Sequence, residues 1–404
     1  MKLRFHQLLA VFFILTISCN KDISSESSIP ERILPKVMIT LNDPNQIITK
    51  KNKIKGNIRI EGGTDYDNYE GSLDFSGRGN NSWRLPKKPF KIKLESQAGL
   101  FGLPAAKKWI LLAEYHDGTM LYNGIPFNMG KMLGIPFTNT MIPVNLYING
   151  KDQGLYVFTE SKEVRNGRID LDKDGILLEM DRYFDEKWKF ESKNFNLPVM
   201  VQYPKEDDMD VAQLQNIQTD FETMESLIFD SSFPNNNYLE YLDDTAFINY
   251  MLVFELTNNR EINIPKSIYL NKQSEDSKYR MGILWDFDWA FGFEDGITSH
   301  YDIQTAEYPL LLDNQDSSGT VFFKKIMSDV HMQQLFNDRW QWFKVNKFEE
   351  LKDKLKDYSE WIRLAYNDDH LLWGERGATG DPDKDLQSAI NWLDARARYM
   401  NNLY

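Results

Sequence analysis

The hydrophobic pattern changes once along this chain of 404 residues, and that change restricts the possible fold more than any other feature. Between residues 33 and 75, runs such as "KVMITL", "NIRIEG" and "GSLDFSG" alternate apolar and polar side chains. This period of two, bounded by Gly, Asn and Asp, predicts strands joined by tight turns. After about residue 300, apolar positions recur every three to four residues, which predicts amphipathic helices. Strands first and helices late predict an α+β fold with mixed or antiparallel sheets.

The middle of the chain mixes both patterns. Residues 141–161 and the pair "KSIYLNK" and "YRMGILWDFD" each predict a hairpin, the first turning at Asn149-Gly150. "GILLEMD" (175–181) predicts a buried strand, while residues 207–230, 239–258 and a stretch from about Met120 are expected to be helical. The clearest helical spacing lies near the C-terminus, at Phe348, Leu351, Leu355, Tyr358 and Ile362, and at Leu386, Ile390, Leu393, Ala397 and Met400.

The first residues have the pattern of an export signal. Lys2 and Arg4 precede an apolar stretch, 8–17, that is too short for a membrane helix, and Cys19 follows. Because Cys19 is the only cysteine, the segment is interpreted as a lipoprotein signal with Cys19 lipidated; the alternative is an ordinary signal peptide with an unrelated cysteine. Either signal predicts a secreted protein, and lipidation predicts a lipid anchor to a membrane, in the outer membrane or periplasm or at the cell surface.

Composition completes the predicted organisation. The Ser-rich residues 20–32 are expected to be a flexible tether. A β-rich segment (33–75) and a larger domain (76–404) follow, with the helical part of that domain from about 315. Hydrophobic residues make up 42% of the chain, which argues against disorder. The net charge of −13 argues against nucleic-acid binding, so any phosphate site must be a local basic pocket.

A glycine-rich stretch, "GRGNNSW" (77–83), is the first candidate binding element. Gly77 and Gly79 would let backbone amides approach a phosphate, and Arg78 would add a charge-assisted hydrogen bond. The next predicted strand places Lys91 and Lys93 on one face, as in folds that grip nucleotide phosphates with a strand lysine. The alternatives are an ordinary hairpin turn and a solvated strand face.

The stretch "ILWDFDWAFG" (283–292) places Asp286 and Asp288 among aromatic residues. On a strand the two side chains would share one face and could hold one Mg²⁺, because substrate phosphates and water complete its coordination. The alternative is a salt-bridged pair at a strand end. Just before this hairpin, residues 255–267 offer Asn259, Glu261 and Asn263 as candidates to orient an acceptor hydroxyl or bind metal.

Other signatures are weaker or absent. "DLDKDGILLEMD" (170–181) fits a calcium-loop pattern, but the loop needs flanking helices and "GILLEMD" is typical of a strand. The sequence contains no G-x-S-x-G, H-E-x-x-H or C-x-x-C, and its five histidines are scattered. Neither a zinc site nor a Ser-His-Asp triad is therefore indicated.

Six segments, taken in order, resemble the spore coat protein H (CotH) kinase family. They are "SGRGNNSW", "PKKPFKIKL", "FGLPAAKKWILLAEYHDGTMLYN", "GLYVFTE", "GILLEMD" and "ILWDFDWAFG". The similarity runs from about residue 35 into the C-terminal helices. It implies an atypical protein-kinase-like fold that uses ATP and a divalent metal, Mg²⁺ or Mn²⁺, to phosphorylate serines on partner proteins. Relatives occur as lipoproteins in Bacteroidetes, in agreement with Cys19.

The resemblance also implies residue roles. It places Arg78 and either Lys91 or Lys93 on the phosphates, and Glu160 near the nucleotide or that lysine. Asp286 takes the metal-binding role, with Asp288 close behind it. The catalytic aspartate of the family belongs in the 258–263 loop, where Glu261 is the only carboxylate and Asn259 its neighbour.

Glu261 in place of the catalytic aspartate is one departure from the family pattern. A second departure is Tyr122, where family members often carry an arginine. The sequence therefore leaves two functions open. One is a kinase that transfers phosphate to a serine or threonine of an envelope or extracellular protein. The other is a catalytically weak nucleotide-binding pseudokinase, or a surface lipoprotein that binds a protein or glycan.

Overall fold

The computed structural model describes residues 32–293, 300–312, 316–374 and 376–403. The predicted signal, Cys19 and nearly all of the predicted tether lie outside these residues. Ile33–Tyr404 form one compact unit. Within the described part, no helix combines the length and the apolar character needed to cross a membrane.

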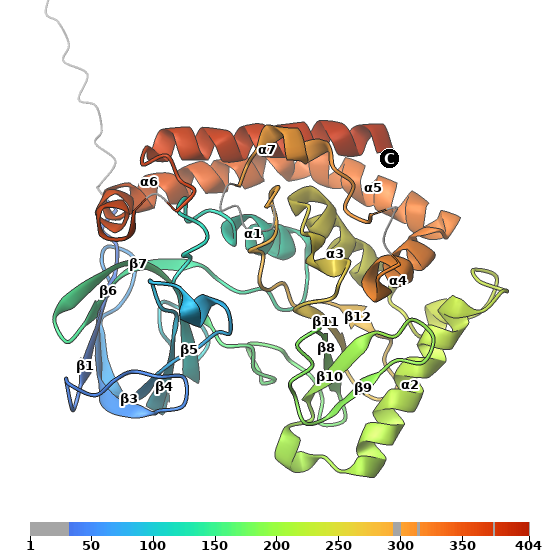
Figure 1. The fold of residues 1–404 in the computed structure, drawn as a ribbon, viewed down its shortest axis with the longest axis horizontal. Coiled ribbons are helices and arrows are strands. Elements are labelled where there is room, and N and C mark those ends of the chain that lie inside the picture. The colour runs from blue at the N-terminus through green and yellow to red at the C-terminus, as the bar shows by residue number, and fades with distance from the viewer. Residues whose placement is uncertain (1–31, 294–299, 313–315, 375, 404) are drawn as a thin grey trace, which may run out of the picture. The chain divides into compact units, whose positions relative to one another are not determined.

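Seven strands close into a barrel in the order β1-β2-β3-β4-β5-β7-β6 (Figure 1). The barrel closes where β1 pairs with β6 in parallel, and its other strand pairs are antiparallel. The predicted alternation is confirmed, since every second side chain of β2 is buried. The strands are Lys36–Leu41 (β1), Ile54–Glu61 (β2), Tyr69–Gly77 (β3), Phe90–Ala98 (β4), Ala106–Leu112 (β5), Ile142–Ile148 (β6) and Lys151–Glu160 (β7).

The predicted domain boundary between residues 75 and 76 falls inside β3. This strand is hydrogen-bonded to β2 on one side and to β4 on the other. The strands of the 33–75 segment therefore share one barrel, and one apolar interior, with the strands that follow them.

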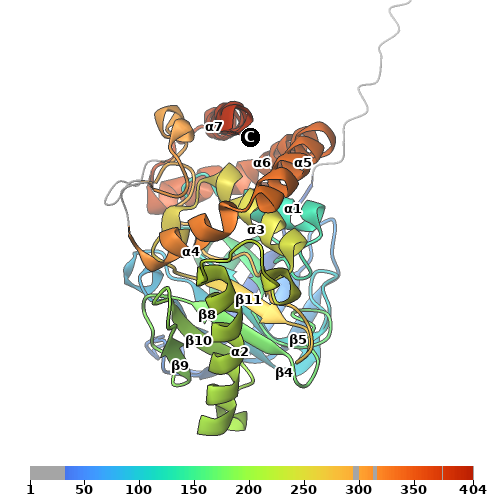
Figure 2. The ribbon, with the colours of Figure 1, turned by 90° about the vertical axis from the view of Figure 1, so that its right-hand side faces the viewer.

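A second sheet of five antiparallel strands has the order β12-β11-β8-β10-β9. Helix α2 (Val211–Phe229) packs on it (Figure 2). The Phe221 ring lies against Phe190 and Tyr279. Helix α3 (Asp244–Thr257) is buried over most of its length. The strands are Ile176–Met180 (β8), Lys189–Glu191 (β9), Pro198–Tyr203 (β10), Ile268–Lys272 (β11) and Arg280–Met281 (β12).

The C-terminal residues form the predicted helices. Helix α6 (Phe348–Trp373) buries Phe348, Leu351 and Leu355 on the face that the spacing indicated. Helices α5, α6 and α7 lie beyond α1 and α3 on the side away from the five-stranded sheet (Figure 1). The remaining helices and 3-10 turns are α1 (Gly124–Leu133), α4 (Ser318–Met327), α5 (Val330–Asn346), α7 (Pro382–Leu403), η1 (Ser82–Arg84), η2 (Glu206–Asp208), η3 (Tyr238–Glu240), η4 (Arg260–Ile262) and η5 (Ile303–Glu307).

One local prediction is wrong. The strand expected to run into "WDFD" ends at Met281, and residues 282–288 are irregular. Asp286 has a φ of 61°, in the left-handed region that a β-strand does not use. The two aspartates therefore do not lie on a β-strand that would place their side chains on one face. If the side chains point the same way, the path of this loop causes it.

Candidate functional site

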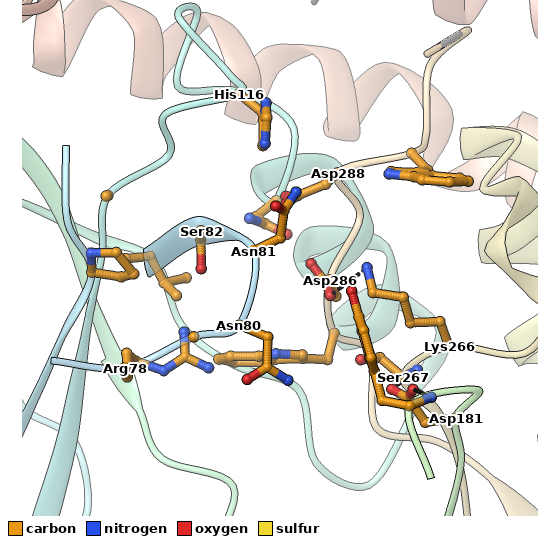
Figure 3. Close-up of a pocket in the computed structure, with 18 of the residues that line it drawn as sticks. Arg78, Asn80, Asn81, Ser82, His116, Asp181, Lys266, Ser267, Asp286 and Asp288 are labelled. Atoms are coloured by element: carbon orange, nitrogen blue, oxygen red, sulfur yellow. Dashed lines mark hydrogen bonds and ion pairs between the residues drawn. The ribbon is translucent and has the colours of Figure 1, made fainter. Parts of the chain in front are cut away.

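A cavity of about 360 Å³ is lined by polar and charged residues that lie at or near the ends of strands from both sheets. Its lining comes from the turn after β3, the segment after β5, Lys162 after β7, the end of β8, and the segments on both sides of the β11–β12 hairpin. Figure 3 shows Arg78 entering from one side, with Asp286 and Lys266 on the other. Residues more than two hundred positions apart in the sequence thus meet at one cavity.

Two cations at this cavity share an aromatic support. The Arg78 guanidinium lies 5.3 Å from the ring centroid of Trp285. The Lys162 ammonium lies 4.8 Å from the same ring and 4.3 Å from the ring of Tyr269, whose hydroxyl accepts a hydrogen bond from it. Burial lowers the pKa of both groups, and Asp286 opposes this by favouring their charged forms. Both are therefore placed to receive an anion in the cavity.

Two carboxylates face these cations. The side chain of Asp286 is 27% exposed, and its Oδ2 lies 3.2 Å from the ammonium of Lys266. Burial, followed by the charge of Asp286, raises the pKa of Asp288 to about 7. A divalent cation would relieve this repulsion, because it favours the ionised form of both carboxylates.

Behind Asp286, Lys266 makes a second ion pair. Its ammonium is 2.6 Å from Oε1 of Glu261, whose side chain is only 2% exposed. Burial raises the pKa of Glu261 well above its ordinary value. Burial would lower the pKa of Lys266, but Asp286 and Glu261 outweigh it and raise that pKa. Lys266 lines the cavity and Glu261 does not.

A third acidic group borders the cavity on the segment after β5. Both carboxylate oxygens of Glu114 accept hydrogen bonds of 3.0 Å from Nδ2 of Asn123. Burial raises the pKa of Glu114 to about 8, and the charges of Asp117 and Asp288 add to the effect. Glu114 is therefore mostly protonated near neutral pH.

The structure brings four predicted residues to this cavity: Arg78, Gly79, Asp286 and Asp288. Gly79 has a φ of 85°, which favours glycine, and a Cβ there would collide with Ser82. Gly77 does not line the cavity. A Cβ at Gly77 would collide with the ring of Trp83, so its small size permits close packing inside the turn.

Lys91 and Lys93 lie elsewhere. Both are exposed on the outer face of β4, and neither lines the cavity. Closure of the barrel explains this, because the apolar face of β4 turns inward and the lysine face turns to solvent. The lysine that reaches the cavity is Lys162, which the sequence analysis did not single out.

Three other predicted residues make contacts that maintain the local structure. Glu160 is buried and accepts a hydrogen bond of 2.8 Å from the backbone N–H of Thr140. Asn259 caps η4 by accepting from the N–H of Glu261 at 3.2 Å, and it donates to the backbone oxygen of Asp286 at 3.3 Å. None of these residues lines the cavity.

Asn263, the third, bonds away from the cavity. Its Nδ2 donates to the backbone oxygen of Leu310 at 2.8 Å, and its Oδ1 accepts from Thr320 Oγ1 at 2.7 Å. Its amide oxygen therefore accepts hydrogen bonds from α4 and from the chain before α4, and not from a ligand in the cavity.

Several charged residues of the cavity were not predicted from the sequence, among them Glu114, Lys162, Asp181 and Lys266. Glu114, Asp181 and Lys266 lie inside segments quoted above for the family resemblance, the calcium-loop pattern and the second hairpin, but none of these patterns assigns them to a phosphate site. Lys162 directly follows the strand end "VFTES", and no local pattern distinguishes it. In the described part of the chain, no three or more His, Cys, Asp or Glu side chains are grouped to hold a metal. The Asp286–Asp288 pair instead suits a cation that also binds phosphate oxygens and water.

The model of the CotH kinase protein family matches residues 75–400. The chain therefore belongs to the CotH kinase family. A search of curated proteins finds no match.

Proposed function

We propose that this protein transfers the γ-phosphoryl group of ATP, bound with Mg²⁺ or Mn²⁺, to a serine or threonine hydroxyl of another protein. The observation that carries the proposal is the meeting of Arg78, Lys162, Asp286 and Asp288 at one cavity. Family membership supports a kinase-like activity. The polar cavity has room for phosphates, and its charges suit a metal-bound triphosphate.

The side chains present fit a metal-bound nucleotide. Arg78 and Lys162 would hold the phosphate oxygens, Arg78 through a planar fork and Lys162 as a point charge. Asp286 and Asp288 would hold the divalent cation. When bound, this cation neutralises charge on the phosphate oxygens during transfer. The backbone of the Gly79 turn can approach the phosphates closely because no Cβ stands in the way.

In this reaction the bond between the γ-phosphorus and its bridging oxygen breaks, and a bond to the acceptor oxygen forms. The acceptor loses its proton to an ionised carboxylate of the cavity, for which Asp181 is the candidate. Burial raises the pKa of Asp181, so its carboxylate is a better proton acceptor than an exposed one. Glu114, whose pKa is about 8, is mostly protonated at neutral pH and is not available as a base. Glu261 lies behind Lys266, and we assign it the role of positioning that lysine.

The acceptor protein belongs to the envelope or extracellular space under this proposal. Its support is the export signal at residues 2–19, with Cys19 as the lipidated residue. Globomycin, which blocks lipoprotein signal cleavage, should leave the expressed precursor uncleaved, and Cys19→Ser should abolish lipidation. Normal processing of the Cys19→Ser variant would overturn the lipoprotein assignment.

A pseudokinase is the second candidate, and the pairing of Glu261 with Lys266 favours it. A catalytic loop whose carboxylate is already neutralised by an ammonium is less able to activate an acceptor. This alternative predicts metal-dependent nucleotide binding without any transfer.

Transfer of radiolabel from [γ-³²P]ATP tests the proposal directly. The acceptors are the protein itself and a generic acidic protein, each with Mg²⁺ and with Mn²⁺. Asp286→Asn should reduce transfer by about a hundredfold or more, because an electrostatic group at the reacting phosphate is lost. Asp170→Asn, an exposed carboxylate outside the cavity, is the control and should transfer normally. Absence of transfer by the wild type would exclude the kinase and favour the second candidate.

A further inference from the structure

Lys266 occupies an unusual place for a lysine. Its side chain is 14% exposed, and its ammonium bridges Oε1 of Glu261 at 2.6 Å and Oδ2 of Asp286 at 3.2 Å. The two carboxylates come from different segments, η4 and the loop after β12. Figure 3 shows Lys266 reaching Asp286 from the side opposite Arg78. A positive charge thus joins two acidic segments at the edge of the candidate metal site.

The position of Lys266 in the sequence matches a metal ligand of the kinase catalytic loop. In that loop, H-R-D-x-x-x-x-N, the asparagine five residues after the catalytic aspartate holds a metal ion, and a second aspartate holds the other. Here Arg260 and Glu261 occupy the positions of the R-D pair, and Lys266 follows Glu261 by five residues. An ammonium cannot be a metal ligand, because it has donors and no acceptor.

The ammonium of Lys266 does not satisfy all the acidic groups around it. Oε2 of Glu261 is buried and has no hydrogen-bond partner. Asp288 lies close enough for its charge to affect Glu261 and Lys266. An unpartnered buried carboxylate oxygen is costly, and it points to a site whose geometry would accommodate a cation of higher charge.

We propose that the ammonium of Lys266 replaces one of the two divalent cations of a kinase-type site, so that this cavity takes a single metal ion at Asp286 and Asp288. This inference rests on the proposed function, because the single metal ion at Asp286 and Asp288 is part of that proposal. Lys266 carries one positive charge where a metal would carry two. The site therefore holds its nucleotide with less positive charge than a two-metal kinase and depends less steeply on metal concentration.

The test counts bound Mn²⁺ in the full chain by electron paramagnetic resonance, with and without a non-hydrolysable ATP analogue. Lys266→Asn restores an amide ligand at the loop position, while Lys266→Arg keeps the cation. Lys352→Asn is the matched control, since Lys352 is 12% exposed and bridges Glu349 at 2.7 Å and Asp394 at 3.1 Å on α6 and α7. Melting temperatures with and without Mn²⁺ are measured in parallel.

With the analogue present, the wild type, Lys266→Arg and Lys352→Asn should bind one Mn²⁺, and Lys266→Asn should bind two. Lys266→Asn should also melt at a lower temperature without metal and recover when Mn²⁺ is added, so a poorly folded variant is still informative. An equal Mn²⁺ count in all four proteins, or two ions in the wild type, would overturn the inference. Failure of the analogue to bind the wild type would instead refute the proposed function; an extra Mn²⁺ in Lys266→Asn without nucleotide would still support the role of Lys266.

Discussion

At the scale of single residues, the site depends on which lysine reaches the phosphates. Lys91 and Lys93 on β4 alternate with apolar residues as expected, but their side chains face solvent and not the cavity. Lys162 instead lies over the rings of Trp285 and Tyr269, beside Arg78. A cation that already lies against aromatic faces is ordered before the ligand binds, so it loses little conformational freedom when it contacts a phosphate. Lys162 is therefore the better-organised partner for an anionic ligand.

Lys162→Met should weaken ATP binding roughly ten- to a hundredfold, because a hydrogen bond to a charged group contributes about 1.5–3 kcal/mol. Methionine keeps the apolar contact with the rings. Lys91→Met is the control and should leave affinity unchanged. Fluorescence anisotropy with a labelled ATP measures both; a larger loss in Lys91→Met would restore the role that the sequence suggested for the β4 face.

Glu114 makes stability depend on pH. Its pKa rises from an ordinary value of 4.5 to about 8 in the folded chain, so the folded state binds more protons than the unfolded state between these values. The contribution of Glu114 to stability is therefore full below pH about 4.5 and is lost as pH rises through about 8.

Glu114→Gln removes this titration while keeping one acceptor for Asn123. The variant should become more stable than the wild type by about 1–3 kcal/mol as pH rises across this window, and the gain should vanish in acid. Urea unfolding at several pH values measures the difference. A gain that does not vary with pH would show that Glu114 is ionised throughout.

At the scale of elements, one buried ion pair joins the barrel to helix α6. Lys87, on the chain before β4, is fully buried and lies 2.7 Å from Oδ1 of Asp369. Asp369 also accepts from the backbone N–H of Leu155 at 2.9 Å and pairs with Arg376. Because Lys87 lines the cavity, this pair fixes one wall of the site to the C-terminal helices.

Asp369→Asn should destabilise the protein by about 3–5 kcal/mol, because it leaves a buried lysine without its counter-ion. Lys87→Met in the same chain should recover part of this loss. Asp353→Asn, which breaks an exposed pair with Lys356, should change stability by less than about 0.5 kcal/mol. Urea unfolding of the single and double variants would contradict the account if the Asp369 and Lys87 effects were additive.

The elements also show how far the sequence could predict the molecule. Alternation located the barrel strands, apolar runs located β8, β11 and β12 of the second sheet, and spacing located α6 and α7, because these patterns are local. The short strands β9 and β10 were not predicted. The parallel β1–β6 pairing that closes the barrel is a contact between distant segments, and no local pattern encodes it. The same limit applies to the site: Arg78 and Asp286 belonged to recognisable motifs, whereas Lys162 belonged to none and is defined only by where closure of the barrel brings it.

At the scale of the whole molecule, the barrel and the helices belong to one compact unit. A chain that begins at residue 76 would lack β1, β2 and most of β3, leaving β4 and β6 as open edges. Open edges with an exposed apolar face favour aggregation. That truncation should be insoluble or lack a cooperative melting transition, whereas residues 33–404 should melt as the longer chain does. A cooperative transition in the 76–404 chain, followed by circular dichroism, would show that the strands of 33–75 are dispensable.

The proposed kinase activity requires that ATP bind at the cavity together with a metal ion, and isothermal titration calorimetry measures this binding most directly. The wild type should bind ATP with Mg²⁺ and lose that binding in the presence of a chelator. Asp286→Asn should bind weakly under both conditions, and Asp170→Asn should behave as the wild type. Equal affinity with and without Mg²⁺, or no heat of binding at all, would contradict the claim that Asp286 and Asp288 form the metal end of a phosphate site.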